Sequence, residues 1–164
     1  MMQPVPRSLV HAFYKAYATR DVEKIGPFLA DDVEWTISGP VGVLSFCGTC
    51  HGKAAVLDLI ANKVPAVFRV FSFVPEDMLV DHDRACALSR LAARNSTDGR
   101  VISYRVANFF RFRDGQLVEN RSIMDSFDAV EQVLGHPLAV HRVEPPADGD
   151  LMEVVDEGDL VVAV

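Results

Sequence analysis

The sequence lacks any uninterrupted apolar run near the ~18 residues that a membrane span needs, and Met1 to Arg7 lack the apolar stretch of a secretory signal. Basic residues are also scarce, with 16 Lys and Arg against 23 Asp and Glu and a net charge of −7. Seven of these acids and one arginine fall within 141–164, so the preceding residues are almost neutral. A chain without a cationic surface attracts phosphates poorly, which disfavours binding to nucleic acid or to anionic membranes. We therefore expect a cytoplasmic protein that binds neither.

Cysteine and histidine are few, and no spacing among His11, His82, His136 and His141 resembles a set of metal ligands. One short motif, Cys47-Gly48-Thr49-Cys50-His51, matches C-x-x-C-H, the attachment signature of c-type haem. Haem attachment requires export to an oxidising compartment, for which the sequence carries no signal. We interpret these cysteines as packing residues, with a redox dithiol as an alternative, and expect neither a metal nor a cofactor.

The remaining composition is that of one globular domain. The 164 residues are 49% hydrophobic, without a glycine period, and a chain of this length can bury a substantial core. We assign 1–140 to the domain and 141–164 to an acidic C-terminal extension that begins near Pro145-Pro146. Its two apolar pieces, 151–155 and 160–164, are compatible either with added edge strands or with a flexible tail.

Periodicity along the domain predicts helices first and strands afterwards. Helical spacing covers about 6–19, a short second helix follows Asp21 and is broken at Gly26-Pro27, and Val33, Trp35 and Ile37 alternate as in a half-buried strand. A loop reaches Gly52, and a helix over 53–64 is ended by Pro65. We then expect strands near 66–74, 85–94, 101–113 and 116–124, with turns at 75–77, 98–99 and 114–115. A last helix starts at Asp125 or Ser126 and stops at Gly135. The order indicates an α+β fold with helices on one face of a mostly antiparallel sheet.

One polar residue stands out within this pattern. Asn108 interrupts the otherwise apolar face of the strand over 101–113, and a buried amide without a partner costs about 1–3 kcal/mol. It either contacts a ligand or is satisfied by backbone at a bulge.

Several phrases together resemble the nuclear transport factor 2-like superfamily and its SnoaL-like branch. They are Leu29-Ala30-Asp31-Asp32-Val33-Glu34-Trp35, Gly48 to Val56, Phe110 to Val118 and Arg121-Ser122-Ile123-Met124-Asp125. The resemblance covers about 8–138. It implies a cone: a strongly curved sheet wrapped around N-terminal helices, with an apolar cavity, usually in a homodimer. The superfamily includes isomerases, hydrolases, cyclases and binding modules, so the fold does not choose among them.

Residue matching narrows the chemistry that the resemblance implies. At the ketosteroid isomerase positions stand Phe13, Ile37 and Asn108, which provide no base. Epoxide hydrolases match at Arg90 and Asp125, but their second acid falls at Ala92. SnoaL-like cyclases need a single aspartate, which Asp125 could supply.

Our hypothesis is that Asp125 acts as general acid and base, that Arg90 sets its charge, and that Asn108 hydrogen-bonds a ligand carbonyl. A carboxyl enclosed by apolar residues can exchange protons near neutrality. The alternatives are that Asp125 caps the last helix and that Arg90 is a solvated side chain. The ligand would be a small apolar molecule with a carbonyl or hydroxyl, and the competing function is a non-catalytic binding or dimerisation module. The expected cavity walls are Phe13, Tyr17, Phe28, Trp35, Ile60, Leu88, Val106, Phe110 and Ile123.

Overall fold

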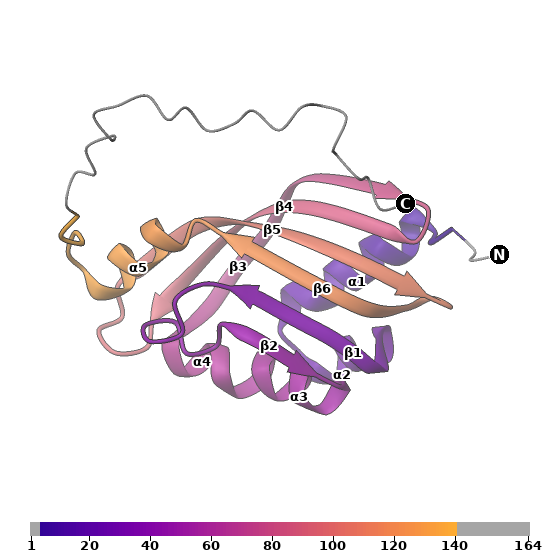
Figure 1. The fold of residues 1–164 in the computed structure, drawn as a ribbon, viewed down its shortest axis with the longest axis horizontal. Coiled ribbons are helices and arrows are strands. Elements are labelled where there is room, and N and C mark those ends of the chain that lie inside the picture. Colours follow the sequence, from indigo (N-terminus) through magenta and orange to yellow (C-terminus); the bar gives the residue numbers. More distant parts are fainter. Residues whose placement is uncertain (1–3, 141–164) are drawn as a thin grey trace, which may run out of the picture.

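A computed structural model describes residues 4–140 of the chain (Figure 1). No helix within this range is long and apolar enough to cross a membrane. The predicted extension, 141–164, lies outside the described residues. The elements, in chain order, are α1 (Arg7–Thr19), α2 (Val22–Ile25), η1 (Gly26–Phe28), β1 (Leu29–Ser38), β2 (Gly48–His51), α3 (Lys53–Asp58), η2 (Leu59–Lys63), α4 (Val64–Val67), β3 (Phe68–Asp81), β4 (Arg84–Asn95), β5 (Val101–Arg113), β6 (Gln116–Met124) and α5 (Ser126–Leu134).

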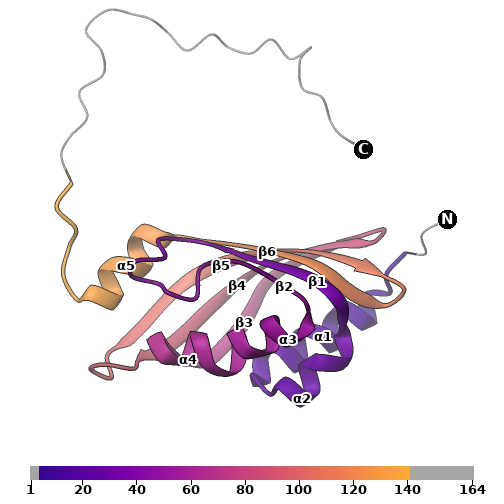
Figure 2. The ribbon, with the colours of Figure 1, turned by 60° about the horizontal axis from the view of Figure 1, so that its bottom comes forward.

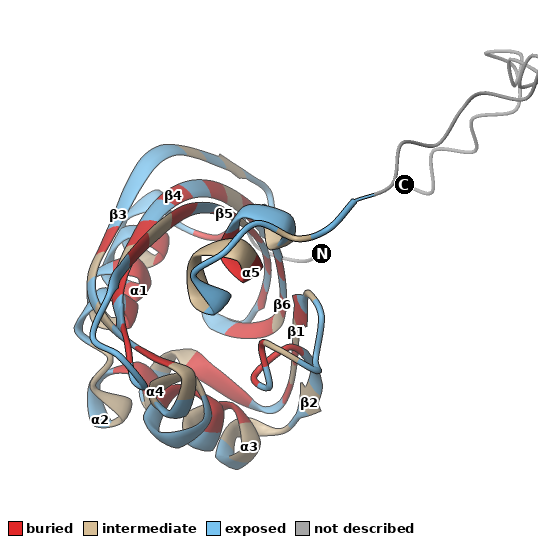
Figure 3. Cartoon of the chain, turned by 90° about the vertical axis from the view of Figure 1, so that its left-hand side faces the viewer, coloured by how far each residue is buried: buried red, intermediate tan, exposed pale blue. Residues whose placement is uncertain are grey.

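The strands form one six-stranded sheet in the order β2-β1-β6-β5-β4-β3. β1 pairs in parallel with β6, while every other neighbouring pair is antiparallel. The sheet is strongly curved, and α1 to α4 cover its concave face (Figure 2). Buried residues alternate with less buried ones along β4 and β5 on the wall of the resulting roll (Figure 3). This is the α+β cone that the sequence predicted.

Most element ends follow their local chemistry. The Asp21 side chain accepts a hydrogen bond from the Glu23 backbone N–H and so begins α2. Asp114 and Gly115 both have positive φ angles, 51° and 78°, as a tight hairpin between β5 and β6 requires. Gly135 ends α5 in the left-handed conformation.

Three local predictions were wrong. The segment predicted as a loop up to Gly52 contains β2, a short strand without a sequence pattern that gains its order by pairing with β1. The turn predicted at 75–77 is an irregularity within β3, where the register shifts between Pro75 and Asp77. Proline is tolerated there because β3 is the edge strand of the sheet.

The third error concerns the helix expected over 53–64. Its second half is a π-helical turn, η2, after which α4 restarts and continues to Val67. Pro65 lies in the first turn of this restarted helix, where a missing N–H is not needed, and therefore does not end it.

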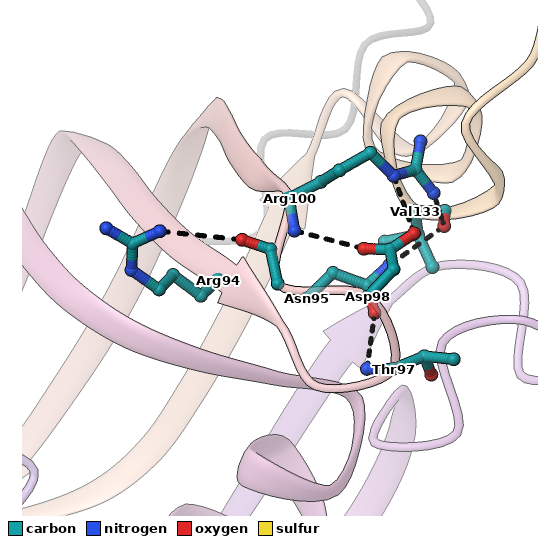
Figure 4. A network of polar contacts seen from close by, with 7 residues as sticks. Arg94, Asn95, Thr97, Asp98, Arg100 and Val133 are labelled. Carbon is teal, nitrogen blue, oxygen red and sulfur yellow. Dashed lines mark hydrogen bonds and ion pairs between the residues drawn. The ribbon is translucent and has the colours of Figure 1, made fainter.

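α5 is attached to the sheet through the backbone carbonyl of Val133 in its last turn (Figure 4) and through the side chain of Gln132. The Val133 carbonyl accepts hydrogen bonds from Asn95 Nδ2 at 3.0 Å and from Arg100 Nη2 at 3.2 Å. The side chain of the preceding residue, Gln132, both donates to and accepts from the Ser103 backbone. These contacts hold α5 against the turn between β4 and β5.

Candidate functional site

A small cavity of about 40 Å³ lies inside the roll, between the C-terminal end of α1, α4 and strands β3 to β6. Its walls are mostly apolar, with Phe46, Phe68, Phe73 and Leu91 among them. Its polar groups are Tyr17, Arg20, Tyr104, Asn108 and Ser122, and the lining contains no Asp, Glu, His or Lys. The cavity therefore offers hydrogen bonds and one positive charge to a ligand, but no carboxylate.

Asn108 belongs to a buried chain of side-chain hydrogen bonds. The Tyr14 hydroxyl donates to Asn108 Oδ1 at 3.1 Å and lies 3.0 Å from Ser89 Oγ. Asn108 Nδ2 donates to Ser122 Oγ at 2.7 Å. Ser89, Tyr14, Asn108 and Ser122 are each at most 3% exposed. The amide is thus held by side chains of α1 and β6, and not by backbone at a bulge.

The chain has a fixed direction. The single proton of Tyr14 goes to Asn108, so Ser89 must donate to the Tyr14 oxygen. Burial raises the pKa of Tyr14 well above its ordinary value, outweighing the opposite effect of the Ser89 hydrogen bond, so the phenol keeps this proton.

Ser122 ends the chain as a donor. Its oxygen accepts from Asn108 Nδ2 and, at 2.9 Å, from Asn120 Nδ2, which occupies both lone pairs of the hydroxyl. The remaining O–H proton has no acceptor among residues 4–140, and Ser122 lines the cavity. The site therefore presents a hydroxyl donor to whatever enters.

Arg20 forms the cationic side of the cavity. Its guanidinium carbon lies 4.2 Å from the centroid of the Tyr17 ring and 4.9 Å from that of Phe73. The field of this charge favours the ionised forms of Tyr14 and Tyr104 and so opposes, in part, the rise in their pKa values that burial causes. Sequence reasoning missed Arg20, because an arginine just after a helix is usually a solvated end residue.

Sequence reasoning placed three side chains, Tyr17, Val106 and Asn108, on the cavity wall, and the structure has them there. Five others are core residues that do not line this cavity: Phe13, Phe28, Trp35, Ile60 and Phe110. Phe13 is the centre of an aromatic cluster, with ring centroids 5.3 Å from Phe110 and 5.9 Å from Phe28. These five core residues pack behind the wall of the cavity.

The prediction that Leu88 and Ile123 line the cavity was wrong. They are 38% and 53% exposed and lie on the outer face of the sheet. The alternating faces of β4 are both rich in small apolar residues, and the inward face is the one with Ala85, Ala87 and Ser89. The sequence period identified the alternation but not which face is inside.

The prediction of an enclosed Asp125 was also wrong. The side chain is exposed, and Oδ1 accepts a hydrogen bond from the Asp128 backbone N–H at 3.1 Å, which makes Asp125 the N-cap of α5. Arg90 is exposed too, with Nε 2.9 Å from Glu76 Oε1. The structure therefore does not bring Arg90, Asp125 and Asn108 together.

Tyr14, Ser89 and Ser122 were not predicted as members of the site. Two of them had a readable signal, because Ser89 and Ser122 share the inward alternation of β4 and β6 with apolar neighbours, as Asn108 does in β5. Cross-strand register pairs Asn108 with both Ala87 and Ser122.

The motif around Cys47 and Cys50 forms no special site. Cys47 is buried and Cys50 half-buried on β2, and both are unbridged. Burial raises the pKa of Cys47 to about 11, which keeps the thiol protonated and unreactive. Within residues 4–140, no group of three or more His, Cys, Asp and Glu side chains is arranged to hold a metal ion.

A second feature is an open depression of about 830 Å³ on the outer face of the sheet. Leu79, Phe109 and Ile123 line it and are 66%, 46% and 53% exposed. Ion pairs of Arg111 and Arg121 with Glu119 lie along the same face. An apolar patch bordered by charges is typical of a protein interface.

A family model described as the SnoaL-like domain matches residues 10–120. A structure provisionally described as an isomerase from Rhodopseudomonas palustris is 31% identical, covers 78% of this chain and 94% of its own, and gives a TM-score of 0.68. No curated protein matches the sequence.

More distant structures share the fold. An LEH-like epoxide hydrolase from M. tuberculosis is 19% identical, with coverage of 78% and 88% and a TM-score of 0.62. A protein with a ketosteroid isomerase-like fold from Catenulispora acidiphila, in complex with trimethylamine, is 14% identical, with coverage of 81% and 95% and a TM-score of 0.65. The resemblance inferred from the sequence and the cone architecture are both confirmed.

Proposed function

Since this chain belongs to the family of SnoaL-like domains, we propose that it binds a small, mostly apolar molecule inside its cone, through an oxygen that accepts a hydrogen bond. The observation that carries the proposal is the directed chain from Ser89 through Tyr14 and Asn108 to Ser122. A buried chain of this kind strengthens its last donor, because each hydrogen bond polarises the next. A carbonyl or hydroxyl oxygen is the group that such a donor recognises.

Binding is favoured over catalysis by what lines the cavity. A proton-transfer enzyme needs a base within hydrogen-bond reach of its substrate, and the lining has no Asp, Glu or His. The acid and base role predicted for Asp125 is not part of this proposal, because its exposed carboxylate caps α5. The predicted cytoplasmic location remains a prediction.

The cavity also limits the ligand. At about 40 Å³ it is far smaller than the roughly 300–1,000 Å³ of sites for drug-sized molecules. We infer that the ligand is small and that flexible lining side chains, such as that of Met124, move when it enters.

The test compares two probes of similar shape, acetophenone and ethylbenzene, of which only the first has a carbonyl. Binding is followed by the fluorescence of Trp35, the single tryptophan, whose ring lies 5.6 Å from that of the cavity residue Tyr17. We expect acetophenone to bind about 2- to 12-fold more tightly than ethylbenzene, the equivalent of one net hydrogen bond. Ser122→Ala should abolish this difference.

Ser103→Ala is the matched control, because the Ser103 hydroxyl donates to the Leu91 carbonyl rather than into the cavity. The control should keep the preference for acetophenone. Equal affinity of the unmodified protein for both probes, or a preference that survives Ser122→Ala, would refute the proposal.

We also propose that the homodimer predicted from the sequence forms through the outer face of the sheet, with a second copy of the chain as its occupant. Leu79, Phe109 and Ile123 supply apolar area, and the mixed charges of Arg111, Arg121 and Glu119 can pair with the same groups of a two-fold related copy. Phe109→Glu should convert a dimer into a monomer in light scattering after size exclusion. A wild-type monomer at 100 μM would exclude this interface.

A further inference from the structure

Arg20 is a cation without an anion. It is half-buried, its Nε atom is enclosed, and no hydrogen-bond partner for Nε exists among the described residues. None of the ion pairs formed within residues 4–140 involves Arg20. Partial burial of a guanidinium without a carboxylate is costly, because the charge loses part of its water and gains no counter-charge.

The nearest acid in the sequence is already engaged. Asp21 accepts a hydrogen bond from the Glu23 backbone and pairs with Lys24 Nζ at 3.1 Å. Arg20 is instead stacked on the rings of Tyr17 and Phe73, which hold its charge at the cavity wall. These contacts hold the side chain in place and leave its N–H groups available.

The backbone at Arg20 is also unusual. Its φ of 59° lies in the left-handed region, which ends α1 and which favours Gly or Asn. An arginine at such a position costs about 1–2 kcal/mol relative to the ordinary conformation, so stability alone does not explain its presence there.

A second buried donor, the indole N–H of Trp35, lies near Tyr17. Trp35 Nε1 has no hydrogen-bond partner among residues 4–140, and the Trp35 ring packs against Tyr17, as Arg20 does. Both groups can only donate. Together with the Ser122 hydroxyl, these groups place three donors near Tyr17 that have no acceptor among residues 4–140.

We propose that the natural ligand is a small organic anion whose charge is carried by oxygen, a carboxylate or an enolate, and that Arg20 is the residue that pairs with it. This inference rests on the proposed function and names the chemical class of the ligand. A carboxylate only accepts hydrogen bonds, and a guanidinium can bind its two oxygens side by side. The apolar remainder of the ligand would lie against Phe73 and the other ring residues of the wall.

The test uses benzoate and its neutral counterpart benzamide, with acetophenone as the reference for the Ser122 site, all followed by Trp35 fluorescence. In the unmodified protein we expect benzoate to bind about 10- to 100-fold more tightly than benzamide, the effect of one charge-assisted, two-pronged contact. Arg20→Asn removes the charge, and Asn adopts the left-handed backbone readily, so the fold should be kept. This variant should lose the preference for benzoate over benzamide.

Arg20→Lys keeps the charge without the two-pronged geometry and should retain part of the preference. Arg94→Gln is the matched control, because Arg94 also lies over a ring, that of Phe71, but not at the cavity. It should leave both affinities unchanged. The inference is overturned if benzoate binds no better than benzamide, as it would if a water satisfied Arg20. It is also overturned if Arg20→Asn keeps the preference for benzoate. Failure of the proposed function has a different signature, namely acetophenone binding that is insensitive to Ser122→Ala.

Discussion

The hydroxyl of Tyr14 offers the sharpest test of the buried chain, because Tyr14→Phe deletes one oxygen and changes little else. The deletion leaves Asn108 Oδ1 without its donor and Ser89 without its acceptor, both in a region that excludes water. Each unsatisfied buried polar group costs about 1–3 kcal/mol. Allowing for some rotation of the Ser89 hydroxyl, we expect the free energy of unfolding to fall by about 2–4 kcal/mol.

Tyr104→Phe is the matched control. Tyr104 is a buried tyrosine in the same roll, and its hydroxyl has no hydrogen bond among the described residues. Urea denaturation should show a loss of less than about 1 kcal/mol for this variant, as for most changes that break no buried contact. If Tyr14→Phe costs no more than Tyr104→Phe, the hydrogen-bonded chain does not stabilise the core and our argument for its direction fails.

A double variant checks the mechanism of the loss. Adding Ser89→Ala to Tyr14→Phe removes one of the two orphaned groups, so the double variant should lose less stability than the sum of the single variants. The same Tyr14→Phe protein should also bind acetophenone more weakly, because Asn108 would no longer be fixed at the angle that orients Ser122.

Three further outcomes follow from the structure. Hydrogen bonds and charge from Arg105, and then from Arg90, hold the pKa of Glu76 below its usual range. The ionised carboxylate therefore stabilises the fold above the unfolded pKa of about 4.3, and this stabilisation is lost as pH falls. Glu76→Gln should flatten the decline of the urea midpoint between pH 6 and pH 3, and an unchanged decline would contradict the pairing. Gly135→Ala should lower Tm more than Gly99→Ala. Both glycines have positive φ, but only a Cβ at position 135 would collide with the Arg100 side chain. Equal losses of Tm in a thermal melt would show that this collision has no effect on stability. Cys47, whose pKa burial raises to about 11, should react with iodoacetamide at pH 8 much more slowly in the native protein than in urea, as mass spectrometry would show, and equal rates would mean that the thiol is accessible.

The sequence was most informative where local chemistry decides the structure. The hairpin at Asp114-Gly115, the cap at Asp21 and the stop at Gly135 each depend on a few neighbouring residues, and all three were predicted correctly. The turn predicted at Pro75 was wrong because an edge strand tolerates a proline that a central strand would not. Only the strand order reveals which case applies.

The site was harder to predict for a similar reason. Asn108 could be recognised because it is polar on an apolar face, but its partners Tyr14 and Ser122 are 94 and 14 residues away, and no local pattern links them. The residues around Asp125 were compatible both with a catalytic role and with a helix cap. The choice depended on whether the Asp125 side chain is buried, which its neighbours in the sequence do not determine. Arg20 matters through the rings on which it stacks, which the chain brings together only when the sheet curls.

The parallel pairing of β1 with β6 also has a consequence for synthesis on the ribosome. The first strand finds its inner neighbour only when residues 116–124 have left the exit tunnel, so the roll cannot close while the nascent chain is still short. Contacts of such long sequence separation slow folding, and they leave the open edge of β1 available to other strands in the meantime. A truncation before β6 would thus leave a chain with every helix but the last and with β1 and β2 unpaired to the rest of the sheet, a state that chaperones commonly bind.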